Sequence, residues 1–308
     1  MHWPALALVM YRTLEVMNEL GSKKSLIRSL AIKSEMTKIG VFDSGFGGLT
    51  VLKALLEAIP HADYLYFGDT ARLPYGSKSV ETVAKYACEA ARFLEQQGAG
   101  LLVVACNTAT ALALEQIRQA TSIEVVGVIE PGAQQAAAAS KTRKVVVIGT
   151  QATISSHAYQ SALAKYQIQS REKACPLLVP LVEEGWTDHA VTKEVAEIYL
   201  REAFADGFTS ADVLLLGCTH YPLLKTVLQK VAPEGVTLVD SAESTAHAVA
   251  SLLKESRSGG NQSAGERAHD NPAEIKFFVT DSVEKFQRLG KLFLGTSMTD
   301  VTHVELKE

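Results

Sequence analysis

The sequence predicts an α/β protein with two pseudo-symmetric lobes, each a mostly parallel sheet flanked by helices, and an active site in the cleft between them. Short apolar strands alternate with amphipathic helical segments from Lys38 onward, which is the pattern of βαβ units. Two similar cysteine motifs follow two of these strands, one in each predicted lobe. At 308 residues, the chain is long enough to bury two cores.

The composition narrows the class of protein. Hydrophobic residues make up 47% of the chain and charged residues 21%, which is typical of a globular protein. The net charge of −4 offers no basic surface for nucleic acid, and no stretch is long enough to span a bilayer, so we expect neither partner. Four cysteines do not make a disulfide framework in a chain of this size, which favours a cytoplasmic enzyme or binding protein.

The predicted strands are short apolar runs, and the predicted helices are longer segments with one apolar face. Because they alternate, we expect parallel strands with helices on both faces of each sheet. The strands are predicted at 38–42, 62–68, 101–105, 124–128, 144–149, 177–182, 213–217, 237–239 and 275–280. The helices are predicted at 49–58, 80–97, 109–120, 133–139, 155–166, 192–204, 223–231, 242–254 and 283–294.

The order of elements predicts a non-contiguous first lobe, residues 37–131 plus 240–308, with the second lobe, residues 132–239, inserted into it. Residues 1–36 are interpreted as an N-terminal extension, because they lack the basic leader and cleavage site of a signal peptide, and Met36 directly precedes the first strand. An appendage or an upstream start of translation is favoured over a regulatory arm. Residues 256–271, rich in Gly, Ser and Asn, predict a flexible loop.

The two cysteine motifs are Ala105-Cys106-Asn107-Thr108 and Gly217-Cys218-Thr219-His220, each between an apolar run and a helical segment. Ligands of open α/β sheets bind outside the carboxyl ends of the strands, so both thiols could face one cleft. Small cysteines can also simply fill a tight turn, but packing does not need the polar neighbours. Two facing thiols indicate a proton donor and a proton acceptor on opposite sides of a substrate.

Other polar groups follow predicted strands. In Asp43-Ser44-Gly45-Phe46-Gly47-Gly48, the glycines allow a tight turn or an approach to an anion, and the carboxylate could orient or accept a proton. Asn107 and Thr108 occupy natural N-cap positions. The run from Asp69 to Gly76 contains Pro74-Tyr75-Gly76, a rigid loop with backbone donors and one phenol, and Arg72, either a carboxylate clamp or a surface arginine. Thr150 and Thr153 follow the end of a predicted strand of the second lobe.

Two further chemistries are open to Cys218 and His220. They could bind a metal, but no other Cys or His stands nearby at zinc spacing, so we expect no metal site. A Cys–His nucleophile pair is the other reading, although it leaves Cys106 without a role. Cys88 reads as helix packing, and Cys175, near the start of an expected apolar strand, receives no role.

Taken together, these motifs resemble the glutamate racemases of the aspartate/glutamate racemase family. The resemblance runs from about Lys38 to Gly295 and includes Val239-Asp240-Ser241 as well as the motifs above. It implies cofactor-independent interconversion of L- and D-glutamate, which supplies D-glutamate for peptidoglycan. Cys106 would act on the D-isomer with help from Asp43, and Cys218 on the L-isomer with help from His220. Substrate contacts or thiol tuning would come from Asp43, Ser44, Tyr75, Gly76, Asn107, Thr108, Thr150, Thr153, Thr219 and His220.

This chemistry agrees with the residue types. A free thiol has a pKa of ~8.5, close enough to neutrality to serve as acid or base. Nothing resembles a Schiff-base lysine site, so no pyridoxal cofactor is expected, and the expected partner is a small-molecule substrate, with a homodimer left open. The alternatives are a one-thiol hydrolase or amidase, a non-catalytic amino-acid-binding protein, and an aspartate-specific racemase; within the family, Thr219-His220 favours glutamate.

Overall fold

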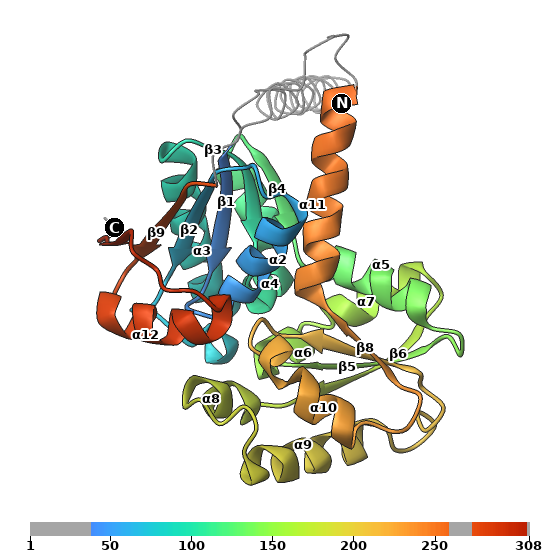
Figure 1. Cartoon of the computed structure of the whole chain (residues 1–308). Coiled ribbons are helices and arrows are strands. Elements are labelled where there is room, and N and C mark those ends of the chain that lie inside the picture. The colour runs from blue at the N-terminus through green and yellow to red at the C-terminus, as the bar shows by residue number, and fades with distance from the viewer. Residues whose placement is uncertain (1–37, 259–272, 307–308) are drawn as a thin grey trace, which may run out of the picture.

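The computed structural model describes residues 38–258 and 273–306. Within these ranges the backbone forms two parallel sheets, each flanked by helices, which confirms the predicted fold class (Figure 1). The predicted extension at 1–36 lies outside the described residues. So does most of the predicted loop at 256–271, except that 256–258 form the end of a helix rather than a loop.

The first sheet has the strand order β10-β9-β2-β1-β3-β4, and every neighbouring pair is parallel. Its central strands are buried almost along their whole length because helices cover both faces, which explains their nearly continuous apolar runs. The strands are β1 (Lys38–Asp43), β2 (Tyr64–Gly68), β3 (Ala99–Val104), β4 (Glu124–Gly127), β9 (Ile275–Val279) and β10 (Val301–His303).

The second sheet has the order β6-β5-β7-β8, again with only parallel pairs. It repeats the β2-β1-β3-β4 portion of the first sheet, so β7 takes the place that β3 has there. The residues that follow β3 and β7, Cys106 and Cys218, therefore stand near equivalent strand ends. The strands are β5 (Lys144–Gly149), β6 (Gln169–Ala174), β7 (Val213–Gly217) and β8 (Thr237–Asp240).

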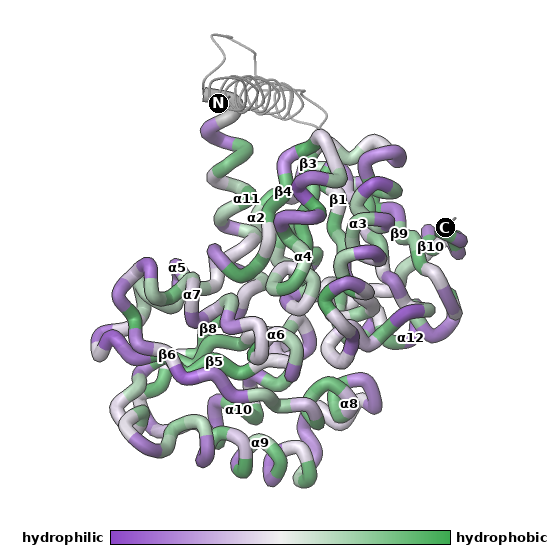
Figure 2. The backbone as a smooth tube through the Cα atoms, turned by 180° about the vertical axis from the view of Figure 1, so that it is seen from behind, coloured by the Kyte–Doolittle hydropathy of each residue, from purple (hydrophilic) through white to green (hydrophobic). Residues whose placement is uncertain are grey.

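The helices connect the strands and cover the sheets. Their buried residues are mostly apolar. Hydrophilic and hydrophobic residues alternate along the helices, while the central strands are hydrophobic apart from their ends (Figure 2). The first group is α2 (Leu49–Ala58), α3 (Val80–Gln96), α4 (Asn107–Ala120), α5 (Ile129–Ala139), α6 (Gln151–Ser155) and α7 (Ala158–Lys165). The second is α8 (Leu178–Glu183), α9 (Ala190–Ala203), α10 (Lys225–Val231), α11 (Ser241–Ser258) and α12 (Val283–Leu294), with short 3₁₀ turns η1 (Tyr75–Ser77) and η2 (Tyr221–Leu224).

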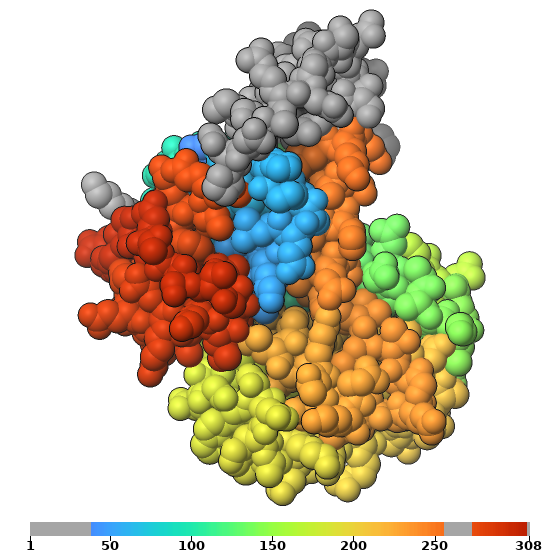
Figure 3. Space-filling view, viewed as in Figure 1, coloured from blue at the N-terminus to red at the C-terminus, as the bar shows by residue number. Residues whose placement is uncertain are grey.

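Helix α11 joins the two halves of the molecule. It follows β8 of the second sheet and packs against α2 and α5, and the chain then returns to the first sheet at β9. In the space-filling view the surfaces of the two halves meet directly, with α11 alongside (Figure 3). The residue boundaries of the lobes, 131/132 and 239/240, stay predictions. None of the helices within 38–258 and 273–306 has the length and apolar character needed to cross a membrane.

Several predicted elements are wrong. The apolar run at 177–182, predicted as a strand, belongs to α8, where Pro180 lies in the first turn and so removes no intrahelical hydrogen bond. The strand of this region is β6, which the sequence analysis missed because its residues Gln-Ser-Arg-Glu-Lys-Ala are polar. They suit its place at the sheet edge, where no side chain of the strand is fully buried. Strand β10 was also missed.

The helix predicted at 155–166 is in fact two helices. Helices α6 and α7 are separated at Ser156 and His157, and His157 has a left-handed backbone with φ of 53°. A residue in this conformation ends one helix and redirects the chain into the next.

Helix α12 is held to the first sheet by an aromatic cluster. The ring of Phe286 is fully buried and lies 5.8 Å from Tyr66, 5.9 Å from Phe46 and 6.0 Å from Phe277, measured between ring centroids. These tilted contacts join α12, β2, β9 and the turn after β1. The segment that follows residues 259–272 is therefore part of the first core.

Replacing Phe286 by Ala should lower the free energy of unfolding by about 3–5 kcal/mol, because it leaves a cavity in this cluster. The matched control is Leu292→Ala on the same helix, where the side chain is 38% exposed. The control should change stability by no more than about 0.5 kcal/mol. Urea unfolding of both variants measures the difference, and equal losses would contradict the packing described for α12.

Candidate functional site

Asp43 ends β1 and lies at the centre of the site. Its side chain is 1% exposed, and its Oδ2 accepts a hydrogen bond from the backbone N–H of Gly45 at 2.9 Å. Its Oδ1 has no hydrogen-bond partner among the described residues. Burial raises the pKa of this carboxyl, while the charge of His220 and the backbone N–H groups of the turn lower it. One carboxylate oxygen is thus free to receive a donor.

Cys106 caps α4. Its sulfur accepts a hydrogen bond from the backbone N–H of Ala109 at 3.4 Å, and its thiol donates to Ser44 Oγ at 3.4 Å. Burial and then the negative charge of Asp43 raise its pKa to about 12. The prediction that Asn107 and Thr108 are N-cap residues is wrong: they are the first two residues of α4, because the sulfur of Cys106 takes the capping role.

Cys218 follows β7 and is paired with a histidine. Its sulfur lies 3.9 Å from Nδ1 of His220, whose Nε2 lies 3.1 Å from the carboxylate of Glu183 on α8. Burial lowers the pKa of His220, but hydrogen bonds to Cys218 and Glu183 outweigh it and raise this pKa to about 10. The imidazole is therefore a cation at neutral pH, placed against the thiol.

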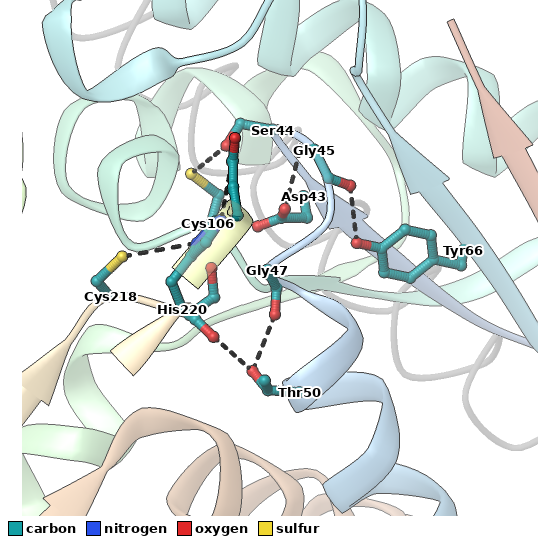
Figure 4. A network of polar contacts seen from close by, with 11 residues as sticks. Asp43, Ser44, Gly45, Gly47, Thr50, Tyr66, Cys106, Cys218 and His220 are labelled. Carbon is teal, nitrogen blue, oxygen red and sulfur yellow. Dashed lines mark hydrogen bonds and ion pairs between the residues drawn. The ribbon is translucent and has the colours of Figure 1, made fainter. Parts of the chain in front are cut away.

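The two halves approach closely at the turn after β1. A Cβ atom on Gly47 would lie 2.2 Å from Thr219 Oγ1 and 2.5 Å from His220 Nδ1. The hydroxyl of Thr50, on α2, donates to the backbone carbonyl of Thr219 at 3.0 Å. Both cysteines, Asp43, Ser44 and His220 consequently gather in one region, as Figure 4 shows.

Three threonine hydroxyls form a second link between the sheets. Thr108 of α4 lies 3.0 Å from Thr150 and 3.2 Å from Thr153, and the latter two are 2.9 Å apart, measured between Oγ1 atoms. Gly76 lies against the same group, since a Cβ there would come within 2.9 Å of Thr150 Cβ. Four residues predicted separately from the sequence are thereby brought together beside Cys106.

Asn107 has a different environment from the one predicted. Its Oδ1 accepts a hydrogen bond from the buried hydroxyl of Tyr159 at 2.6 Å, and its Nδ2 donates to Ser241 Oγ at 3.4 Å. Tyr159 belongs to α7 and Ser241 begins α11. The Asn107 side chain therefore ties the start of α4 to α7 of the other half and to the start of α11, the helix that joins the two halves.

Tyr75 and Arg72 do not offer free side chains. The hydroxyl of Tyr75 donates to Asp69 Oδ2 at 2.6 Å, and its ring is 1% exposed. Arg72 pairs with Glu89 at 2.8 Å and stacks over the ring of Tyr86 at 4.2 Å. Any contact of Tyr75 with a small molecule would have to use its backbone, and the cation of Arg72 is already paired.

Sequence reasoning missed Glu183, Thr50 and Tyr159. Glu183 was hidden because the run directly before it, 177–182, is predicted as a strand and not as the helix that carries it. Thr50 and Tyr159 look like ordinary helix residues. The other two cysteines match expectation in part: Cys88 is half-buried on α3 and packs in the core, while Cys175 is buried just after β6 and not in an apolar strand. All four are free thiols.

In the described part of the chain no three His, Cys, Asp or Glu side chains cluster as metal ligands would.

Comparison with known proteins finds a matching family model, related sequences and solved structures of the same fold. The family model described as Asp/Glu/hydantoin racemase matches residues 39–249, more than half of the chain. A protein of Koribacter versatilis named glutamate racemase is 59% identical over 282 residues, covering 87% of this chain and 97% of the relative. A glutamate racemase isoform from Bacillus anthracis superposes with a TM-score of 0.80 at 38% identity, covering 88% of this chain and 98% of that one. The glutamate racemase of Francisella tularensis, solved with D-glutamate, gives 0.78 at 37% identity over the same shares.

The ring of His220 should titrate with a midpoint near pH 10 instead of its ordinary 6.5. Because its pKa is raised in the folded chain, the stability it contributes is complete below pH 6.5 and is lost as pH rises through about 10. Nuclear magnetic resonance of ¹⁵N-labelled histidine measures the midpoint, and Glu183→Gln should lower it. In the control, Glu172→Gln removes the carboxylate beside the exposed His157 and should leave the titration midpoint of His220 unchanged. A His220 midpoint near 6.5 in the unaltered chain would contradict the charge assignment.

Proposed function

Because the chain belongs to the Asp/Glu/hydantoin racemase family, we propose that it interconverts L- and D-glutamate by proton transfer at the α-carbon, without a cofactor. The observation that carries the proposal is the pair of thiols near equivalent strand ends, each beside its own ionisable partner. The name of the Koribacter relative and the D-glutamate in the Francisella structure support glutamate as the substrate. Inversion of a carbon centre needs a base on one face and an acid on the other, and two thiols can provide both.

The two thiols have different charged neighbours. The imidazolium of His220, fixed by Glu183, stands 3.9 Å from the sulfur of Cys218. Burial and the charge of Asp43 raise the pKa of Cys106 to about 12, so Cys106 holds a proton that it can donate. In the proposed reaction Cys218 removes the α-proton of L-glutamate, and Cys106 delivers a proton to the opposite face. After one turnover Cys218 carries the proton and Cys106 is the thiolate, which is the arrangement needed for the reverse direction.

Asp43 links substrate binding to the state of Cys106. Its unpartnered Oδ1 can accept a hydrogen bond from the ammonium group of the substrate. That positive charge would offset the carboxylate charge that helps to keep the Cys106 pKa high. Binding of the amino acid thus makes the Cys106 thiolate more accessible when D-glutamate is the substrate.

The remaining predicted contacts surround the two thiols. We assign the substrate carboxylates to the hydroxyl and backbone N–H groups that lie around Cys106 and Cys218. On the Cys106 side the donors are Ser44, Asn107, Thr108, Thr150, Thr153 and the backbone of Tyr75 and Gly76; on the Cys218 side they are Thr219 and His220. The product D-glutamate would serve peptidoglycan synthesis in the cytoplasm.

A thiol hydrolase is the second candidate, since Cys218, His220 and Glu183 are arranged as a nucleophile, a base and an orienting carboxylate. In that chemistry Cys218 would form a covalent acyl intermediate, and Cys106 would have no part. The two candidates differ in whether Cys106 is needed.

Purified protein, treated with a chelator and dialysed, should convert either D- or L-glutamate into a racemic mixture. The expected result follows from a mechanism in which the two thiols carry all proton transfers. Circular dichroism of the amino-acid solution measures the reaction, and solvent deuterium should appear at the α-carbon. Activity that disappears with chelator and returns with zinc would overturn the cofactor-independent mechanism.

Replacement of Cys106 or Cys218 by Ser should abolish racemisation in both directions, because each direction uses one thiol as base and the other as acid. In heavy water, Cys106→Ser should still exchange the α-proton of L-glutamate faster than that of D-glutamate, and Cys218→Ser should show the opposite preference. Cys88→Ser is the control, since Cys88 is half-buried on α3, and it should leave the rate unchanged. Near-normal racemisation by either single variant would favour a one-thiol mechanism.

A further inference from the structure

A buried carboxylate at the end of β2 has no part in the chemistry above. Asp69 is fully buried and directly follows β2, whose neighbour β1 ends at Asp43. Its backbone N–H donates to the carbonyl of Asp43 at 3.1 Å. A buried carboxylate is costly unless its oxygens accept hydrogen bonds, so the groups that bond to Asp69 indicate its role.

The hydrogen-bond partners of Asp69 come from its own loop and from the segment after β9, which is distant in the sequence. Oδ2 accepts the hydroxyl of Tyr75 at 2.6 Å, and Oδ1 accepts the hydroxyl of Thr280 at 2.8 Å. Arg72 Nη1 lies 3.8 Å from Oδ2, on the solvent side of the cluster. Hydrogen bonds to an ionised carboxylate are short and strong, so Asp69 fixes both hydroxyls in place.

Thr280 follows β9 and is itself anchored. Its hydroxyl also accepts a hydrogen bond from the backbone N–H of Ala71 at 3.0 Å. The hydroxyl of Thr70 donates to the carbonyl of Asp281 at 2.9 Å and accepts from its N–H at 2.8 Å. The loop after β2 is therefore bound along its length to the segment after β9.

The other end of this loop reaches the site. Tyr75 and Gly76 form η1, where Gly76 lies against Thr150 of the second sheet, and Thr150 bonds to Thr108 two residues from Cys106. The Tyr75 ring is clamped between Phe42 and Tyr86, at 6.3 and 6.2 Å between ring centroids, so its hydroxyl has one fixed direction. The position of the Gly76 backbone thus depends on the bond between Tyr75 and Asp69.

We propose that Asp69, held by Thr280, is a positioning residue that sets the Tyr75–Gly76 loop against Thr150 and so determines how tightly the amino-acid substrate is bound. This inference rests on the proposed function, in which the backbone of that loop contacts a substrate carboxylate. Since the loop touches substrate equally before and during proton transfer, its displacement should change KM and leave kcat nearly unchanged.

The test compares Asp69→Asn, Tyr75→Phe and Thr280→Val. Losing a hydrogen bond to a charged group weakens the structure that it holds by roughly a factor of ten in the equilibrium constant, so the displaced loop should raise KM for glutamate by up to about tenfold in Asp69→Asn and Tyr75→Phe, with kcat within about threefold. Thr280→Val should change KM in the same direction by a smaller factor. The double variant Asp69→Asn/Tyr75→Phe should be no worse than Asp69→Asn, because both remove the same link.

Asp212→Asn is the matched control. Asp212 also accepts several hydrogen bonds, from Ser140, Lys141 and Thr142, but it directly precedes β7 and so lies at the opposite end of that strand from Cys218. Its loss should lower the Tm and leave KM unchanged. If Asp69→Asn fails to fold, Tyr75→Phe and Thr280→Val still test the proposal. Tyr75→Phe removes one hydroxyl group, and Thr280→Val exchanges a hydroxyl group for a methyl group.

Hydrogen–deuterium exchange provides a readout that needs no activity. Tyr75→Phe should speed exchange of the η1 amides in the chain without substrate, and Asp212→Asn should not. A wild-type protein that fails to racemise glutamate would overturn the proposed function, while the exchange data would still report on the loop. Unchanged KM and unchanged η1 exchange in Tyr75→Phe, beside an active wild type, would overturn this inference alone.

Discussion

The turn between β1 and α2 can lie against the loop after β7 only because Gly47 has no side chain, and it can fold over Asp43 only because Gly48 has none. A Cβ at Gly47 would collide with Thr219 and His220, and one at Gly48 would come within 2.4 Å of the Asp43 side chain. The rest of the site depends on this contact. It places Asp43 and the capped start of α4 in the same region as Cys218 and its histidine, although the two sets of residues belong to different sheets.

Each of the two thiols has a different charged neighbour. Asp43, the carboxylate of the first sheet, raises the pKa of the thiol next to it, whereas the second sheet supplies an imidazolium beside Cys218. Two similar sheets thus place their thiols beside opposite charges. The proposed reaction would use both thiols, and neither sheet alone contains the pair.

Most of the fold could be predicted because parallel strands buried on both faces must be apolar and are easily seen in the sequence. Strand β6 could not, because an edge strand with polar residues lacks that pattern, and α8 could not, because a short apolar run fits a helix as well as a strand. The cysteine motifs and the residues beside them were visible as runs of unusual polar residues at strand ends. Glu183 was not, since only the folded backbone brings it to His220. The bonds from the Asn107 and Tyr75 side chains to Tyr159 and Asp69 also depend on the folded backbone and could not be read from the sequence.

The burial of the site has a consequence for the time course of any reaction there. Cys106 and Cys218 are each only 5% exposed, and the hydroxyl link between Thr108 and Thr150 and the bond from Thr50 to Thr219 cross the junction beside them. In the proposed reaction, an amino acid would reach the thiols when these contacts open, and the product would leave when they open again. Motions between lobes take microseconds to milliseconds, roughly as long as many enzymatic turnovers. The contacts would then set an upper limit on the rate of the proposed reaction, and a more viscous solvent would lower that limit.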